Sequence, residues 1–155
     1  MIHWIPLINS VNLWLQVAFT VGATIYALVL GGPAARAAAV VNALGWIVGS
    51  ISNYLVHPAS LQLTITCTQD ALVAAGFLFL AVRYNSPWLC LGVIAQGLQL
   101  GLDFLLIGDW TRMAWQNRFA AGVVLNGLTY VLQFSVLGVT LEERRRLALA
   151  GPVRV

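Results

Sequence analysis

Two carboxyl groups in strongly apolar stretches are the residues of this chain best suited to chemistry. Asp70 lies in the middle of the apolar run from Leu61 to Tyr84, and Asp103 lies near the end of the next apolar run. A carboxyl group at membrane depth costs several kcal/mol unless it is neutral, paired or hydrated, so it is by default a candidate functional residue. A site built on such a group would respond to protons or cations.

Every apolar segment carries a row of polar or small residues at helical spacing. Residues three or four positions apart share one face of an α-helix. We therefore expect one polar row per helix, with the rows meeting on the axis of a bundle and the apolar faces meeting lipid. The rows are Asn9, Asn12, Gln16, Thr20 and Thr24; Asn42, Gly45, Gly49 and Asn53; Gln62, Thr66, Gln69 and Asp70; Gln96, Gln99 and Asp103; and Asn126, Tyr130 and Gln133.

Counting residues from the span ends sorts these side chains by depth. Asp70 lies nine residues from the outer end of its run, which is roughly 14 Å along a helix and near the centre of a hydrocarbon core about 30 Å thick. Gln99 and Tyr130 reach the same level, whereas Asp103 and Asn126 form a shallower layer. These five are the candidate binding residues. No Arg, Lys or His lies at either depth, so we expect Asp70 to be protonated at neutral pH unless water or a cation reaches it.

The composition places these residues in an integral membrane protein. Of the 155 residues, 60% are hydrophobic and only 8% are charged, and the mean hydropathy is +0.86. A soluble domain carries about a quarter of its residues as Lys, Arg, Glu and Asp. The chain is therefore expected to be an all-α bundle forming a single transmembrane domain over residues 1–155.

Five apolar segments are long enough to cross a bilayer, which takes about 20 residues. Pro33, Pro58 and Pro87 lie at the breaks between the first four segments, where proline prevents the helix from continuing. The segment after the fifth span can extend its helix, with Glu142 and Arg146 spaced for an i,i+4 ion pair. The expected spans are about 11–30, 35–56, 61–84, 88–108 and 119–140, followed by a tail over 141–155.

The arginines predict the orientation of the bundle. With five spans, most of them fall on one side of the membrane, and the rule that basic residues stay inside makes that side cytoplasmic. We expect the N-terminus outside and the C-terminus inside, in a multi-pass protein of the cell membrane, namely a bacterial inner membrane. The arginine-rich side carries Arg36, Arg83, Arg144, Arg145, Arg146 and Arg154, and the other side carries Arg112 and Arg118.

Several classes of site find no support in the sequence. There is no basic cluster beside aromatic residues, so a nucleic-acid partner is not expected. His3 and His57 are placed as solvated loop residues, too shallow to bind haem and without the ligand spacing of a metal site. Cys67 and Cys90 fall in opposite leaflets, too far apart for a disulfide. We expect no catalytic residue, cofactor or metal.

Small residues and amides also hold membrane helices together, so the polar rows can have a purely structural role. The pairs Gly45/Gly49 and Gly97/Gly101 suit close helix contact, and Asn, Gln and Thr form interhelical hydrogen bonds. The favoured function is therefore a structural or accessory subunit that packs in a larger membrane assembly or with copies of itself. The partners are then the lipid bilayer and other membrane subunits.

Two other functions remain open. The first is a small transporter, channel or solute-binding protein with a proton- or cation-sensitive site at Asp70, and the second, less favoured, is a lipid-modifying membrane enzyme. A polar cavity of water size or larger at Asp70 would weaken the accessory interpretation. A dry Asp70 bonded to a neighbouring amide would weaken transport.

Overall fold

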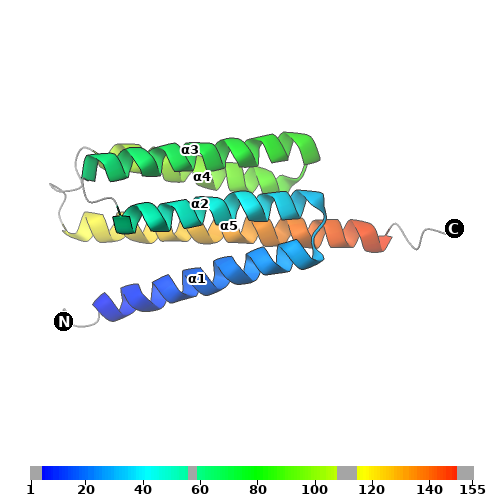
Figure 1. The fold of residues 1–155 in the computed structure, drawn as a ribbon, viewed down its shortest axis with the longest axis horizontal. Helices are drawn as coiled ribbons and strands as arrows, with labels where there is room; N and C mark the ends of the chain where they lie inside the picture. Colours follow the sequence, from blue (N-terminus) through cyan, green and yellow to red (C-terminus); the bar gives the residue numbers. More distant parts are fainter. Residues whose placement is uncertain (1–4, 56–58, 108–114, 150–155) are drawn as a thin grey trace.

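A computed structural model describes residues 5–55, 59–107 and 115–149, and its regular structure is entirely helical. Figure 1 shows the helices lying side by side, with α1 diverging from the others toward its N-terminal end. All five are long and apolar enough to span a membrane, in agreement with the all-α prediction. The helices are α1 (Ile5–Leu30), α2 (Pro33–Leu55), α3 (Ala59–Tyr84), α4 (Pro87–Ile107) and α5 (Trp115–Leu149).

α1 and α5 extend well beyond the spans expected from hydropathy, and the extension of α5 past residue 140 agrees with the helical tail expected from the sequence. α1 begins at Ile5 instead of near residue 11. α5 contains 35 residues and continues to Leu149, a length of about 50 Å that exceeds the hydrocarbon core by several turns. A helix can continue through polar residues beyond its membrane-spanning part. Only the apolar part has to match the thickness of a bilayer.

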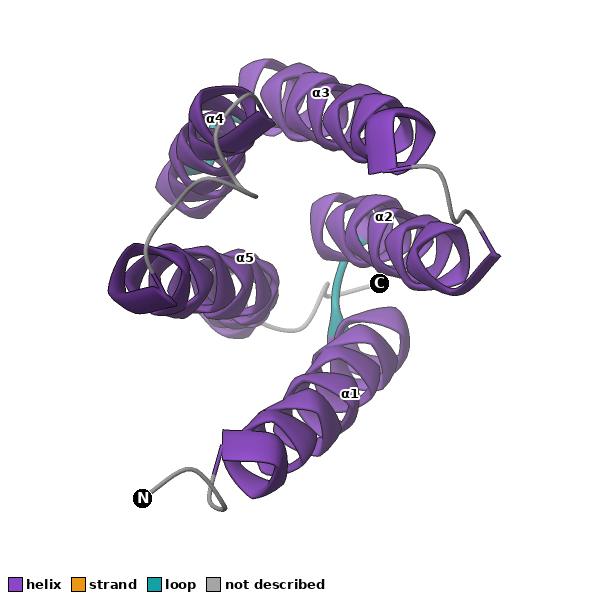
Figure 2. Ribbon diagram, turned by 90° about the vertical axis from the view of Figure 1, so that its left-hand side faces the viewer, coloured by secondary structure: helices purple, strands orange, loops and turns teal. Residues whose placement is uncertain are grey.

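Four of the helices enclose a common interior. α2, α3, α4 and α5 form a closed ring in which each helix contacts two neighbours, and α1 packs outside the ring against α2 and α5 (Figure 2). The interior of the ring is therefore lined by one face of each of four helices. α1 contacts only the outer side of this ring, at α2 and α5.

The two turns that the structure describes, between α1 and α2 and between α3 and α4, lie at the end where α5 continues beyond its neighbours (Figure 1). We call this the arginine end, because Arg36, Arg83 and Arg144–Arg146 lie there. Asn85 ends α3 with a φ of 47°, a left-handed conformation that asparagine tolerates better than most residues. Proline occupies the first position of both α2 and α4, where its fixed φ suits a helix and its missing N–H is not needed.

The C-terminal extension of α5 forms hydrogen bonds to both turns. The carboxylate of Glu143 accepts hydrogen bonds from the backbone N–H groups of Ala34 (3.2 Å) and Ala35 (3.0 Å), at the start of α2. A negative group is favourable there, because the first N–H groups of a helix have no partner within the helix. Ser86 donates to Glu142, which also forms the predicted ion pair with Arg146 at 2.6 Å.

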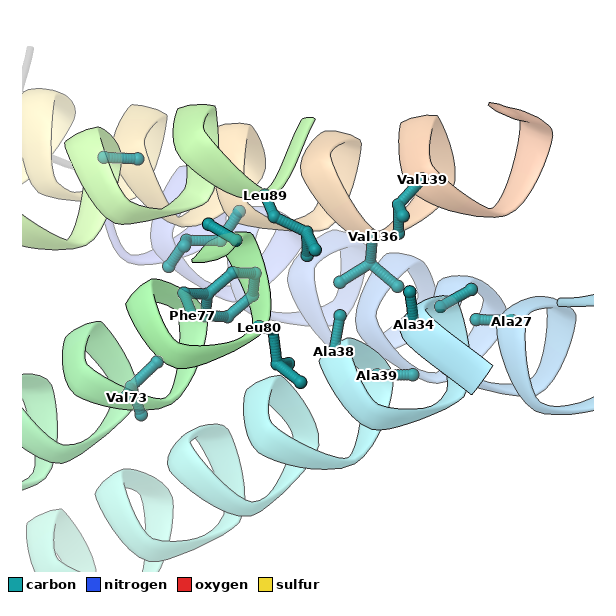
Figure 3. Packing of buried hydrophobic residues seen from close by; sticks show 14 residues of the cluster. Ala27, Ala34, Ala38, Ala39, Val73, Phe77, Leu80, Leu89, Val136 and Val139 are labelled. Carbon is teal, nitrogen blue, oxygen red and sulfur yellow. The ribbon is translucent and has the colours of Figure 1, made fainter. Parts of the chain in front are cut away.

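The apolar core lies toward the arginine end of the bundle. Phe77 and Leu89 are fully buried beside Val136 of α5, and the alanines at the start of α2 pack closely against them (Figure 3). Small side chains on α2 let the helices approach closely, which gives dispersion contacts between them. This end of the bundle is closely packed by apolar side chains, and the polar rows lie farther from it.

Replacing Glu143 by alanine should lower the free energy of unfolding by about 1–2 kcal/mol, because two N–H groups of α2 lose a charged acceptor. Glu143→Gln should lose less, since its amide oxygen can still accept one of the bonds. Denaturant titration of the purified protein in detergent micelles, followed by tryptophan fluorescence, measures both. Two variants as stable as the unchanged chain would show that these hydrogen bonds add nothing.

Candidate functional site

Asp70 lines a polar cavity in the interior of the four-helix ring. Its side chain is buried, with 2% of the residue exposed, and it faces a space of about 70 Å³. One water needs roughly 10–15 Å³ on this measure, so the cavity has room for more than one. The lining residues are Asn42, Gly45 and Trp46 of α2; Gln69, Asp70 and Val73 of α3; Gln96 and Gln99 of α4; and Thr129, Leu132 and Gln133 of α5.

Asp103 lies close to Asp70, although it does not line the cavity. Its carboxyl and the side chain of Gln96, both on α4, lie within hydrogen-bonding reach of the Asp70 carboxyl. Asp103 is two residues farther from the turn than Asp70, in agreement with a shallower level, but the two carboxyls are not separated as the layers implied. α3 and α4 form an antiparallel hairpin, in which residues equally distant from the turn face each other. Asp70 lies fifteen residues before Asn85, and Asp103 lies seventeen residues after Ser86.

Three oxygen atoms of residues that line the cavity, and one of the neighbouring Asp103, are buried without a hydrogen-bond partner. They are Oδ2 of Asp70, Oδ2 of Asp103, Oε1 of Gln69 and Oε1 of Gln99. Buried polar atoms in folded proteins nearly always have a partner, and exceptions mark functional groups or a bound water or ion. All four atoms accept hydrogen bonds or coordinate cations, so a species that donates or carries positive charge would satisfy them.

Two glycines on α2 determine how closely α3 approaches the cavity. A Cβ atom on Gly45 would lie 2.5 Å from Cγ2 of Val73, and one on Gly49 would lie 2.9 Å from Oε1 of Gln69. Both distances are too short for real contacts, so any larger residue would push the helices apart. The predicted close contact at this glycine pair is present, and it holds Gln69 at the wall of the cavity.

A second polar row joins α1 to α5 outside the ring. Tyr130 donates to Oδ1 of Asn12 at 3.1 Å, and Gln16 donates to Oδ1 of Asn126 at 2.7 Å. Of the five sequence candidates, only Asp70 and Gln99 line the cavity. Asp103 lies beside Asp70 without lining it, whereas Tyr130 and Asn126 belong to the separate row. The expectation that all rows meet on one axis was wrong, because α1 packs on the outside of the ring.

Gln133 connects the two polar regions. Its amide donates to Oγ1 of Thr20 on α1 at 2.9 Å, and its oxygen accepts from Nδ2 of Asn42 on α2 at 2.9 Å. With 1% of its surface exposed, it is among the most buried polar residues described. Because it also lines the cavity, one side chain links α1, α2 and the site.

Three glutamines belong to the site although they are not among the five sequence candidates. Gln69, Gln96 and Gln133 all line the cavity. Each lies in a polar row of the sequence, but depth counting from span ends did not separate them from residues that only join helices. Counting from the α3–α4 turn would have drawn attention to α4 residues opposite Asp70.

Comparisons with protein families, curated proteins and solved structures found nothing that matches this chain. Within the described ranges, no three residues among His, Cys, Asp and Glu lie together as metal ligands. His3 and His57 lie outside those ranges. The site is thus defined by two carboxyls and several amides.

Replacing Gln133 by leucine should lower the free energy of unfolding by about 1–2 kcal/mol, because Thr20 and Asn42 both lose their buried partner. Gln16→Leu is the matched control, since it removes a single, partly buried bond between α1 and α5, and its loss should be smaller. Equilibrium unfolding in mixed micelles compares the two. A Gln133→Leu protein at least as stable as the control would contradict the linking role of this side chain.

Proposed function

We propose that this chain is a small multi-pass membrane protein that handles protons or small cations, as a transporter or channel, at the Asp70–Asp103 pair. It would lie in a bacterial inner membrane with the arginine end in the cytoplasm and the N-terminus outside. The observation that carries the proposal is the buried Asp70 carboxyl, with one oxygen unpartnered, at the wall of a polar cavity. A structural hydrogen bond alone needs neither the cavity nor the free oxygen.

The chemistry of two adjacent carboxyls supports this proposal. Two ionised carboxylates side by side repel each other, and the low polarity of the surroundings strengthens that repulsion. A shared proton or a bound cation removes it. Among the residues that line the cavity there is no basic side chain, so the compensating charge must come from solution.

The packing of the bundle supports access from one side. The apolar core, which includes Phe77, Leu89 and Val136, lies between the cavity and the arginine end. Closely packed apolar side chains leave no path for a hydrated ion. A proton or cation would therefore reach Asp70 from the opposite side of the membrane, the outer side in the orientation proposed above.

Asp70→Asn, which keeps the size of the side chain, should abolish proton movement in liposomes that contain the purified protein and a trapped pH-sensitive dye. Infrared spectroscopy should also show that a carboxylic-acid C=O band of the unchanged protein is lost or shifted in the variant. Glu143→Gln removes a carboxyl outside the cavity and serves as the control. Unchanged flux and an unchanged band in Asp70→Asn would contradict the proposal.

A second candidate function, a subunit that associates with copies of itself, is supported by an open face of α4. A Cβ atom on Gly97 or Gly101 would meet nothing within 4 Å, so this small-residue pair is not used for packing between the described helices. Such pairs allow two membrane helices to approach closely. Association through this face would place two bundles side by side.

Gly97→Leu and Gly101→Leu should leave the fold of the single chain intact and reduce self-association. Energy transfer between donor- and acceptor-labelled copies in liposomes measures the association. Gly22→Leu is a matched control, because Gly22 on α1 also has open space around it. Equal energy transfer in all three variants and the unchanged chain would exclude this face as the interface.

A further inference from the structure

A proton shared by the two carboxyls would leave other unpartnered oxygens at the cavity without a partner. Besides the two carboxyls, Gln69 and Gln99 each present a buried amide oxygen with no partner. We propose that the cavity binds one hard divalent cation, of the Mg²⁺ or Ca²⁺ type, through carboxylate and amide oxygens. This inference rests on the proposed function and names the class of ion for the same site.

The type of ligand atom selects the class of ion. Carboxylate and amide oxygens suit Mg²⁺, Ca²⁺ and Mn²⁺, whereas softer metals prefer sulfur and imidazole nitrogen. Cys67 is buried one turn before Asp70 on α3, but it does not line the cavity. All four unpartnered atoms near the cavity are oxygens, so the set is that of a hard cation.

The charge of the site selects a divalent ion. Two carboxylates carry two negative charges, and one divalent cation neutralises both, which lowers the cost of charge at membrane depth. Arg36, Arg83 and Arg144, by contrast, lie at the arginine end, on the far side of the apolar core. When the ion binds, it forms bonds to carboxylate oxygens, and the proton that the two carboxyls shared is released to water.

The size of the cavity also fits one ion. A space of about 70 Å³ holds more than one water molecule, and hence an ion that keeps part of its hydration. Mg²⁺ and Ca²⁺ commonly keep water ligands in proteins. The glutamine oxygens come from α3 and α4, so the ion would bind to both arms of the hairpin.

Binding of Mn²⁺ to the full-length protein in lipid nanodiscs tests this inference. Electron paramagnetic resonance measures the free ion at pH 7, with Mg²⁺, Ca²⁺ and Na⁺ as competitors. We expect one Mn²⁺ per chain, displaced by Mg²⁺ or Ca²⁺ and not by an equal concentration of Na⁺. The affinity should fall about tenfold or more in Asp70→Asn and in Gln99→Leu, and it should be unchanged in Glu143→Gln.

Three results would overturn the inference. The first is an absence of bound Mn²⁺, the second is displacement of Mn²⁺ by Na⁺ at equal concentration, and the third is equal Mn²⁺ binding by Asp70→Asn, which would assign the ion to surface carboxylates. If the infrared band still responds to Asp70→Asn while Mn²⁺ does not bind, the site handles protons and the divalent ion is excluded. If neither responds, the proposed function fails as well.

Discussion

The structure depends on polar hydrogen bonds between helices, and those of Gln133 show this most clearly. Helices in lipid gain little from burying apolar surface against each other, so they associate through close contacts and polar bonds. Gln133 uses its donor for Thr20 and its acceptor for Asn42, and in this way joins α5 to both α1 and α2. The position of α1, which packs only at the edge of the ring, depends on a row of such bonds.

Along its length, the interior of the bundle consists of an apolar part and a polar part. Toward the arginine end, alanines of α2 and the side chains of Phe77, Leu89 and Val136 fill the interior. Farther from that end the same ring contains glutamines and the Asp70 carboxyl around a cavity. A uniformly apolar interior would give a stable bundle without a site, and a uniformly polar one would open a path through the membrane. The arrangement leaves a polar cavity next to a packed apolar core.

The carboxyl pair follows from the geometry of a single hairpin. The turn at Asn85 and Ser86 aligns α3 and α4, so that Asp70 and Asp103 come within hydrogen-bonding reach. Their contact is unfavourable unless a positive charge joins them. The hairpin therefore brings two acidic groups together, and the amides of Gln69 and Gln99 add unpartnered acceptors nearby.

The sequence by itself determined the class of fold and much of the local structure. Apolar run lengths predicted five membrane-length helices, and helical spacing placed the polar residues of each helix on one face, because both depend only on neighbours along the chain. The Glu142–Arg146 pair was predictable for the same reason. The spacing of Gly45 and Gly49 predicted a close helix contact, but it did not identify α3 as the partner. Tertiary structure alone decided which faces meet. It placed α1 outside the ring, so that Asn126 and Tyr130 bond to α1 and not to the site, and it brought Asp103 and Gln96 to Asp70. Depth along one helix cannot reveal this, because the register between two helices is fixed by the turn that joins them and by the packing around them.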